Sequence, residues 1–471
     1  MSLIWVLSAA VAATPTTRTS SVGPIGPVDV VRTASTATLD PVGRTHTASA
    51  AIDASVRTSS AVPDFYRAVR APEPVGLEPG RLLSSLPGSI VELAFAPLTP
   101  IIKVVEKYHL VERYIQLITN DERTFAVTPI VEPFSSSGIG FGAIAAWNDP
   151  LGSPDRAILL GLVRINGDRQ VSLNFGRRLP VLSGRAIRVS ASYDVDHDNN
   201  WFGIGGGSLL SDQRLLQKDE ILLTVGLGEL APQFINIDGS IDVGYRRVEL
   251  RSGRGSTAPS FELGGDVAAP PGFGKNSDYL QLSWDARYDS RDGVGRTTEG
   301  VVLSFSGDGS YEFGGSDEEI TGGLRTTGQA TWLVPVLPRN RVLVLSAGFS
   351  AALPIFDVDE VALHQLVTLG GPNRLRGYQP NRFYDRLGYW GTAEYRFLLS
   401  NYAGSLVGFS AALFVDVGNV GRDWSDLFTD RLSWSAGIGL RAETDYTPPA
   451  RVQVAVSPDG IRFSVGVGEW F

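Results

Sequence analysis

The sequence contains no cysteine, which excludes disulfides, thiolate metal sites and cysteine nucleophiles. It also lacks any apolar run of the roughly 18 residues that a membrane-spanning helix requires. If the chain spans a membrane, it must therefore do so with β-strands, because a closed barrel is the other structure that satisfies every backbone group in lipid. The 53 glycines, 14 tyrosines and 9 tryptophans fit a barrel, which uses glycine at kinks and aromatic residues at its interfaces.

The usual marks of an enzyme are missing as well. No Gly-x-Ser-x-Gly elbow is present, and the glycine-rich stretch 203–207 lacks the strand-to-helix setting of a phosphate-binding loop. The four histidines have no zinc-ligand spacing, and the acidic residues at 194–198 lack the glycine and final glutamate of a calcium loop. We therefore predict a protein that is not an enzyme and has neither a cofactor nor a metal. The formal net charge of −9 argues against nucleic acid as a partner.

The N-terminal third has three parts. Residues 1–13 combine a short apolar core with an alanine-rich end, which predicts a secretory signal peptide. Residues 14–81 are rich in Thr, Ser, Ala, Val and Pro without a period, and such a low-complexity segment is expected to be disordered. Residues 82–123 are predicted to lie in the periplasm and to carry a helix over 101–118.

The 101–118 helix is predicted to be amphipathic. Its apolar stripe includes Ile101, Val105, Tyr108 and Ile115 at helical spacing. One interpretation is that the stripe packs on the protein's own barrel. The other is that it docks a periplasmic partner, plugs the lumen or lies on the inner face of the membrane.

From Thr124 onward the pattern has period two. Between Arg185 and Asp196, apolar residues occupy one face and polar or charged residues occupy the other. A strand with lipid outside and water inside requires this alternation. Inward charges such as Asp242, Asp285 and Arg441 would be costly in a dry sandwich core but are tolerated in a wet lumen.

Sixteen such segments can be counted, starting near residues 124, 138, 155, 168, 184, 219, 234, 277, 299, 321, 341, 388, 408, 431, 450 and 460. An even number places both ends of the barrel at the periplasmic side, and the long connections then all fall on the outer side. These connections are 198–219, 249–276, 356–387 and 419–430. We predict an all-β fold, a 16-stranded antiparallel transmembrane β-barrel over 124–471 with a short N-terminal helical segment.

The last strand is predicted to alternate outward at Phe463, Val465, Val467 and the terminal Phe471. This arrangement resembles the C-terminal signal that is read by the barrel-assembly machinery of bacteria. Glu469 departs from that signal, because an apolar residue is usual there.

Two motifs resemble those of the Omp85 superfamily, also known as the bacterial surface antigen family. Gly370-Gly-Pro-Asn-Arg-Leu-Arg-Gly-Tyr378 is similar to the tip of the family's sixth extracellular loop, and Phe414-Val-Asp-Val-Gly418 is similar to its Phe-x-Asp-x-Gly motif. The resemblance implies that the loop folds into the lumen, where Arg376, followed by Gly377 and Tyr378, pairs with Asp416. Strand alternation independently turns Asp416 inward. Glu394 resembles the family's second acidic partner of the loop, and Gly418 completes the lumen motif.

Two further elements extend the resemblance over most of the barrel. The stretch 288–292 resembles the family's Tyr-Asp-Thr-Arg-Asp turn, and 201–205 resembles a Phe-Tyr-Gly-Ile-Gly element. Members of the family usually carry periplasmic POTRA domains with a β-α-α-β-β pattern. Only 123 residues precede the predicted barrel, and they show no such pattern, so the chain is similar to a short, POTRA-less branch.

The resemblance implies a protein of the Gram-negative outer membrane that takes part in membrane biogenesis. The expected mechanism is insertion or translocation of proteins or lipids through a weak seam between the first and last strands, weakened by Pro129, Pro133 and Glu469. The alternative is a non-catalytic structural or lipid-homeostasis barrel acting as a homo-oligomer or with a periplasmic partner. Expected partners are outer-membrane lipids or lipopolysaccharide, client barrels and a periplasmic protein.

Overall fold

The computed structural model describes residues 117–120, 122, 124–135, 138–152, 155–179, 185–229, 236–255, 258–262, 265–293, 296–313, 321–336, 341–355, 360–401, 408–429, 432–443 and 449–471. The chain divides into two units, Met1–Thr14 with Leu77–Phe471, and Pro15–Gly76. The described residues all belong to the first unit, and they include no helix long and apolar enough to cross a membrane. The predicted signal peptide, the 14–81 segment and residues 101–116 of the predicted helix, including Ile101, Val105, Tyr108 and Ile115, lie outside the described residues.

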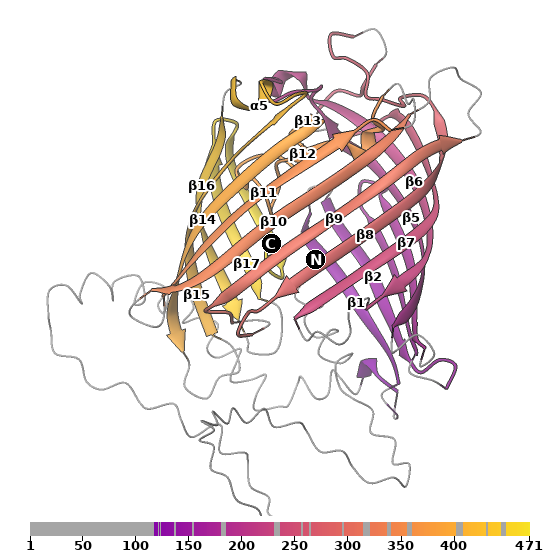
Figure 1. The fold of residues 1–471 in the computed structure, drawn as a ribbon, viewed down its shortest axis with the longest axis vertical. Helices are drawn as coiled ribbons and strands as arrows, with labels where there is room; N and C mark the ends of the chain where they lie inside the picture. The colour runs from indigo at the N-terminus through magenta and orange to yellow at the C-terminus, as the bar shows by residue number, and fades with distance from the viewer. Residues whose placement is uncertain are drawn as a thin grey trace, which may run out of the picture. The chain divides into compact units, whose positions relative to one another are not determined.

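Sixteen long strands form one antiparallel sheet (Figure 1). They are β1 (Phe125–Ser135), β2 (Gly138–Asn148), β3 (Asp155–Arg164), β4 (Arg169–Arg178), β5 (Ala186–Trp201), β6 (Arg214–Gly228), β7 (Ile237–Ser252), β8 (Asn276–Asp289), β9 (Gly300–Phe313), β10 (Gly322–Val336), β11 (Arg341–Leu353), β14 (Leu387–Asn401), β15 (Gly408–Gly421), β16 (Ser433–Glu443), β17 (Ala450–Ser457) and β18 (Gly460–Val467). Each strand pairs with the next one in this order. The predicted number of strands and their antiparallel arrangement are confirmed.

The alternation along each strand sorts side chains between the two faces of the sheet. Large apolar residues such as Phe305, Trp332 and Ile438 are 52%, 57% and 60% exposed on the outer face, where lipid would cover them. Polar residues on the same strands, among them Thr331 and Ser435, are buried on the inner face. The period-two pattern therefore determines which side of every strand faces the lumen.

One strand boundary differs clearly from the sequence prediction, because β6 begins at Arg214 instead of near 219. Leu215 and Leu216 are adjacent and both fully buried, which breaks the alternation. Leu215 forms backbone hydrogen bonds with the loop residues Pro259 and Phe261, at 2.9 and 3.0 Å. Loop residues pack on both faces of this outer end of β6. Neither face is turned to lipid there, so apolar and polar residues need not alternate.

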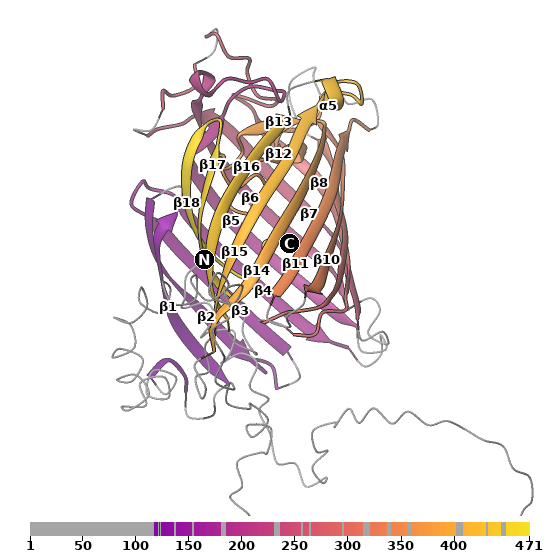
Figure 2. The same ribbon diagram turned by 90° about the vertical axis from the view of Figure 1, so that its left-hand side faces the viewer.

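The two ends of the sheet are not joined. β1 and β18 approach each other (Figure 2), but no ladder connects them in the part of the chain that the structure describes. The sequence predicted a barrel closed by a weak seam; the described strands instead curl round with two edges facing each other. β18 ends at Val467, and the chain leaves the line of the strand at Gly468, whose φ is 92°.

The connection between β11 and β14, residues 354–386, is called loop 6 below. It contains the 3-10 helix η5 (Leu363–Gln365) and a short ribbon formed by β12 (Val367–Leu369) and β13 (Phe383–Asp385). Two buried apolar clusters hold it. One joins η5 and the ribbon to β5–β8, and the other packs the loop tip on Trp390 and Val420 of the wall. The outer loops also carry the 3-10 helix η4 (Leu210–Asp212) and the short helix α5 (Asp426–Thr429).

Candidate functional site

The tip of loop 6 turns sharply into the lumen. Gly370 and Gly371 have φ values of 105° and 114°, a region that favours glycine. A Cβ on Gly370 would lie 2.4 Å from the carbonyl oxygen of Gln379. The backbone N–H of Tyr378 donates to the carbonyl of Leu375 at 3.0 Å and closes the turn that carries Arg376. These two glycines let the ribbon end in a hairpin narrow enough to enter the lumen.

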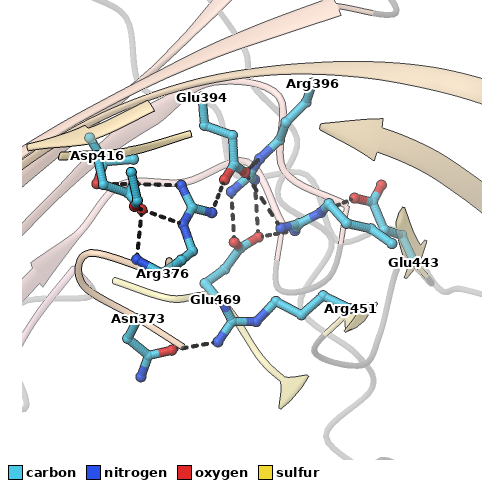
Figure 3. Close-up of polar contacts among 11 residues, drawn as sticks. Asn373, Arg376, Glu394, Arg396, Asp416, Glu443, Arg451 and Glu469 are labelled. Carbon is cyan, nitrogen blue, oxygen red and sulfur yellow. Dashed lines mark hydrogen bonds and ion pairs between the residues drawn. The ribbon is translucent and has the colours of Figure 1, made fainter. Parts of the chain in front are cut away.

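Arg376 is buried and meets two carboxylates from neighbouring strands (Figure 3). Its Nη2 and Nε donate to the two oxygens of Asp416 on β15, at 2.8 and 3.0 Å, and its backbone N–H adds a third bond of 3.0 Å. Its Nη1 donates to Glu394 on β14 at 2.6 Å. A guanidinium bound in this two-pronged way is fixed in orientation as well as in position.

Further contacts enclose the Arg376 guanidinium. Thr392 and Ser435 each donate a hydroxyl hydrogen bond of 3.0 Å to Asp416. The guanidinium carbon lies 3.4 Å from the centre of the Phe414 ring, a cation–π contact. Burial by itself lowers the pKa of Arg376, but the hydrogen bond to Asp416 and the charge of Glu394 outweigh it, and the pKa is raised. Arg376 therefore stays charged and locks the tip.

The two residues after Arg376 fit the wall closely. A Cβ on Gly377 would lie 2.8 Å from the Cβ atoms of both Ser435 and Ser457, so only glycine lets the tip approach β16 and β17. The Ser457 hydroxyl donates to the carbonyl of Gly377 at 2.8 Å. Tyr378 is buried with its ring 5.1 Å from that of Phe383.

Gly418 of the second motif serves the same packing. A Cβ there would lie 2.7 Å from the Tyr389 carbonyl oxygen and 3.3 Å from the Leu369 side chain. The structure thus brings together Arg376, Gly377, Tyr378, Glu394, Asp416 and Gly418, all of which the sequence placed at this site.

The charged network continues from Glu394 to the C-terminus. Arg396 bridges Glu394, at 2.7 Å, and Glu469, at 2.8 Å. Arg441 donates to Glu469 at 2.6 Å and to Glu443 at 2.7 Å. Burial alone would raise the pKa of Glu469, but Arg396 and Arg441 lower it to about 2. Glu469, which departs from the C-terminal assembly signal, is therefore the carboxylate that ties the chain end to the loop 6 network.

The segment after β18 crosses into the lumen. Trp470 is buried against Leu333, Val342 and Val344 on the inner face of β10 and β11. Its ring also lies 5.2 Å from the Arg376 guanidinium. Loop 6, entering from the outer side, and the last three residues of the chain therefore meet inside the barrel.

The predicted outward position of Phe471 is wrong. Phe463 is 55% exposed on the outer face and Val465 is partly exposed, but the strand ends at Val467, whose side chain lies outside the described set. Phe471 packs on Trp470, and its ring lies 5.8 Å from the Arg396 guanidinium. The alternation fails here because the turn at Gly468 takes the chain out of the strand.

Sequence reasoning missed a second anchor of loop 6. Arg382 donates to Asp459 in the β17–β18 turn at 2.6 Å and to the hydroxyl and carbonyl of Ser208 at 2.8 Å each. Its guanidinium also lies 4.5 Å from the Phe202 ring. The alternation of apolar and polar residues gave no signal for Arg382, Asp459 and Ser208, because all three lie in loops, where residues follow no period.

The two remaining motifs also lie in defined contacts. Trp201 is fully buried with its ring 5.0 Å from that of Tyr384, and the Gly205 N–H donates to the Tyr384 carbonyl at 2.8 Å. The 201–205 element therefore supports β13. In the 288–292 turn, Arg291 donates to Asp289 at 2.6 and 2.8 Å and its guanidinium lies 5.7 Å from the Phe471 ring.

One acidic group lies outside the lumen network. Asp168, Asp196 and Asp198 each place a carboxylate oxygen within 4.8 Å of the others near the outer end of β5. Asp168 accepts a hydrogen bond of 2.8 Å from the His197 backbone. Acidic residues often gather without an ion, and we attach no metal function to this group.

Comparison with known proteins matches residues 163–471, more than half of the chain, to the Omp85 superfamily domain. BamA from Haemophilus ducreyi lacking POTRA domains 1–3 has a similar structure, with a TM-score of 0.54 and 17% identity over 73% of this chain and 69% of that one. CdiB from Escherichia coli aligns with a TM-score of 0.46 and 13% identity, covering 72% of this chain and 61% of that chain. CdiB from Acinetobacter baumannii gives 0.43 and 12%, covering 73% and 66%. A comparison with curated proteins gave no sequence match. The chain belongs to the Omp85 superfamily of outer-membrane β-barrel proteins.

Proposed function

We propose that this protein inserts or translocates outer-membrane proteins through the seam between β1 and β18. The observation that carries the proposal is that these two strands have no ladder between them among the described residues. Each therefore presents a row of backbone N–H and C=O groups that could pair with a strand of a client. Membership in the Omp85 superfamily supports the same role.

The edges differ in what they offer to an incoming strand. β1 has 11 residues, of which Pro129 is exposed and contributes no N–H to either neighbour. β18 has only 8 residues before the chain turns inward. An edge that is short or interrupted forms a weak pair with its natural partner. In this proposal a client strand pairs with these open edges and is later released.

The charged network in the lumen holds the strands next to the seam in place. Arg376 ties loop 6 to β14 and β15, and Glu469 ties the end of β18 to β14 and β16. In this proposal the wall from β10 to β17 stays rigid while the β1–β18 edge separates. Loop 6 fills part of the lumen, which also disfavours a passive pore.

The absence of cysteine allows a direct test of the seam. Cysteines would replace Val127 in β1 and, in separate variants, Phe463 or Val465 in β18. The control is Val454→Cys with Phe463→Cys, which spans a residue pair of the existing β17–β18 ladder. Each variant would be reconstituted in liposomes and given a urea-unfolded outer-membrane barrel as client.

We expect the oxidised seam variant to stop assembling the client, and reduction to restore assembly. The oxidised control should work like the wild type, because its crosslink joins strands that do not separate. If a fully crosslinked seam assembled the client as well as the control, the proposed route would be wrong. Normal client levels with altered lipid asymmetry in a deletion strain would instead favour the structural or lipid-homeostasis role.

A further inference from the structure

A second feature of the lumen lies away from the seam and from the Arg376 network. A cavity of about 410 Å³ lies beneath the β12–β13 ribbon, against the inner faces of β6 to β11. Its lining includes Arg246, Asp308, Arg325 and Arg374 and the hydroxyl-bearing residues Ser283 and Ser306. Its volume is within the range of small-molecule sites, roughly 300–1,000 Å³.

The lining carries an excess of positive charge. Three arginines, Arg246, Arg325 and Arg374, face one carboxylate, Asp308, so the formal charge of the lining is three minus one, or +2. Arg325 is neutralised by Asp308, to which it donates two hydrogen bonds of 2.6 and 3.0 Å. The excess therefore belongs to Arg246 and Arg374.

Arg246 is only partly balanced by its neighbours. Its Nε lies 3.5 Å from Glu220, forms no hydrogen bond and is buried. Glu220 also accepts a hydrogen bond of 2.9 Å from Lys218, so one carboxylate serves two cations.

Arg374 differs sharply from Arg376, two residues further along loop 6. Arg376 binds two carboxylates, whereas no hydrogen bond or ion pair is found for the Arg374 side chain among the described residues, and its guanidinium lies 3.7 Å from the Trp390 ring centre. Burial, with a smaller effect of Arg325, lowers the pKa of Arg374 to about 10. The stack on Trp390 holds this cation at the cavity wall with its hydrogen-bonding edge unused.

We propose that this cavity binds a phosphate-bearing ligand. A phosphate monoester has a charge close to −2, which matches the +2 lining, and three oxygens that can accept from several guanidiniums at once. The hydroxyls of Ser283 and Ser306 provide further donors in the lining. The cavity is larger than a phosphate group, so free phosphate and the phosphorylated head of a lipid are both possible sources of the same chemistry. The inference does not depend on the seam.

The test uses the full chain in detergent and inorganic phosphate as the probe, with binding measured by calorimetry. Arg374→Gln removes the unpaired cation and keeps a side chain of similar length. Arg254→Gln is the matched control, because Arg254 is exposed in an outer loop and does not line the cavity. Native mass spectrometry of the same samples detects any phosphorylated lipid that copurifies. Folding is checked by the shift of the unheated band in gels, and Arg246→Gln replaces Arg374→Gln if the latter does not fold.

We expect the wild type and Arg254→Gln to bind phosphate alike and Arg374→Gln to bind it at least about tenfold more weakly. Copurification of a phosphorylated lipid with Arg254→Gln but not with Arg374→Gln would also support the site and identify a lipid as its source. Equal phosphate binding by the two variants would overturn the proposal. Displacement of phosphate by an equal concentration of acetate, or the absence of both signals, would overturn it as well.

Discussion

Replacing Glu469 by Gln should release the end of the chain from the lumen. The substitution keeps the size of the side chain but removes the charge that Arg396 and Arg441 share. A pKa of about 2, against an ordinary value of 4.5, corresponds to roughly 3 kcal/mol of stabilisation at neutral pH. Loss of one member of a buried ion pair costs a similar amount, about 3–5 kcal/mol.

Carboxypeptidase digestion measures this release, because the enzyme needs a free chain end. If opening is fast relative to cleavage, a loss of roughly 3 kcal/mol raises the open fraction about a hundredfold. Mass spectrometry monitors the removal of Phe471 and Trp470, which should be faster in Glu469→Gln than in the wild type by a comparable factor. Glu443→Gln is the control, because Glu443 pairs with Arg441 in the same network but does not hold the chain end.

The same prediction has a pH dependence. The folded-state pKa of Glu469 is depressed, so its stabilisation is present above about pH 4.5 and is lost as the pH falls towards 2. The difference in hydrogen exchange at the C-terminus between wild type and Glu469→Gln should therefore shrink over that range. A digestion rate for Glu469→Gln within about twofold of the wild type would refute this reasoning, as would equal acceleration by Glu443→Gln.

Three further outcomes are expected. Arg376→Ala removes the cationic partner of the buried Asp416, whereas Glu394 keeps its ion pair with Arg396. Loss of one member of a buried pair costs about 3–5 kcal/mol, so a protease should cut loop 6 while the barrel still shows its folded band in gels. Unchanged resistance would contradict the pairing. Gly377→Ala places a Cβ 2.8 Å from two serine Cβ atoms, and this overpacking should destabilise the docked loop by about 1–3 kcal/mol, measured as faster proteolysis of loop 6. Gly328→Ala has open space around its Cβ and should not change the rate. Burial, reinforced by the charge of Asp426, raises the pKa of Asp385 in β13 to about 6. The ionised carboxylate therefore destabilises the folded ribbon, and this loss of stability sets in as the pH rises from about 4 to about 6. Protection of the β12–β13 ribbon in hydrogen exchange should fall over that range in the wild type but not in Asp385→Asn.

Much of the barrel could be predicted because lipid and water impose a local rule on each strand. The alternation around Asp416 already turned this residue inward, and the count of segments predicted the number of strands. The rule fails where lipid no longer faces the chain. Leu215 and Leu216 lie at the outer end of β6, where loop residues bond to Leu215, and Phe471 follows a turn, so neither place keeps period two.

The residues of loop 6 were found through motifs, but their contacts depend on distance in the folded chain. Arg376 and Asp416 are 40 residues apart and meet because loop 6 returns into a lumen that β15 lines. Arg382 and Ser208 are 174 residues apart and follow no pattern. Pairing between loops is decided by how the barrel brings their ends together, which no local period records.

The sequence by itself determined the strands, the face that each strand turns to the lumen and the motif that marks loop 6. Only the tertiary structure decided that β1 and β18 lack a ladder, that Glu469 points into the lumen and that Arg374 faces a cavity with excess positive charge. The physical reason is that alternation follows from the solvent on each side of one strand. Edges, ion pairs and cavities depend on strands that are distant in the sequence and become neighbours when the sheet curls.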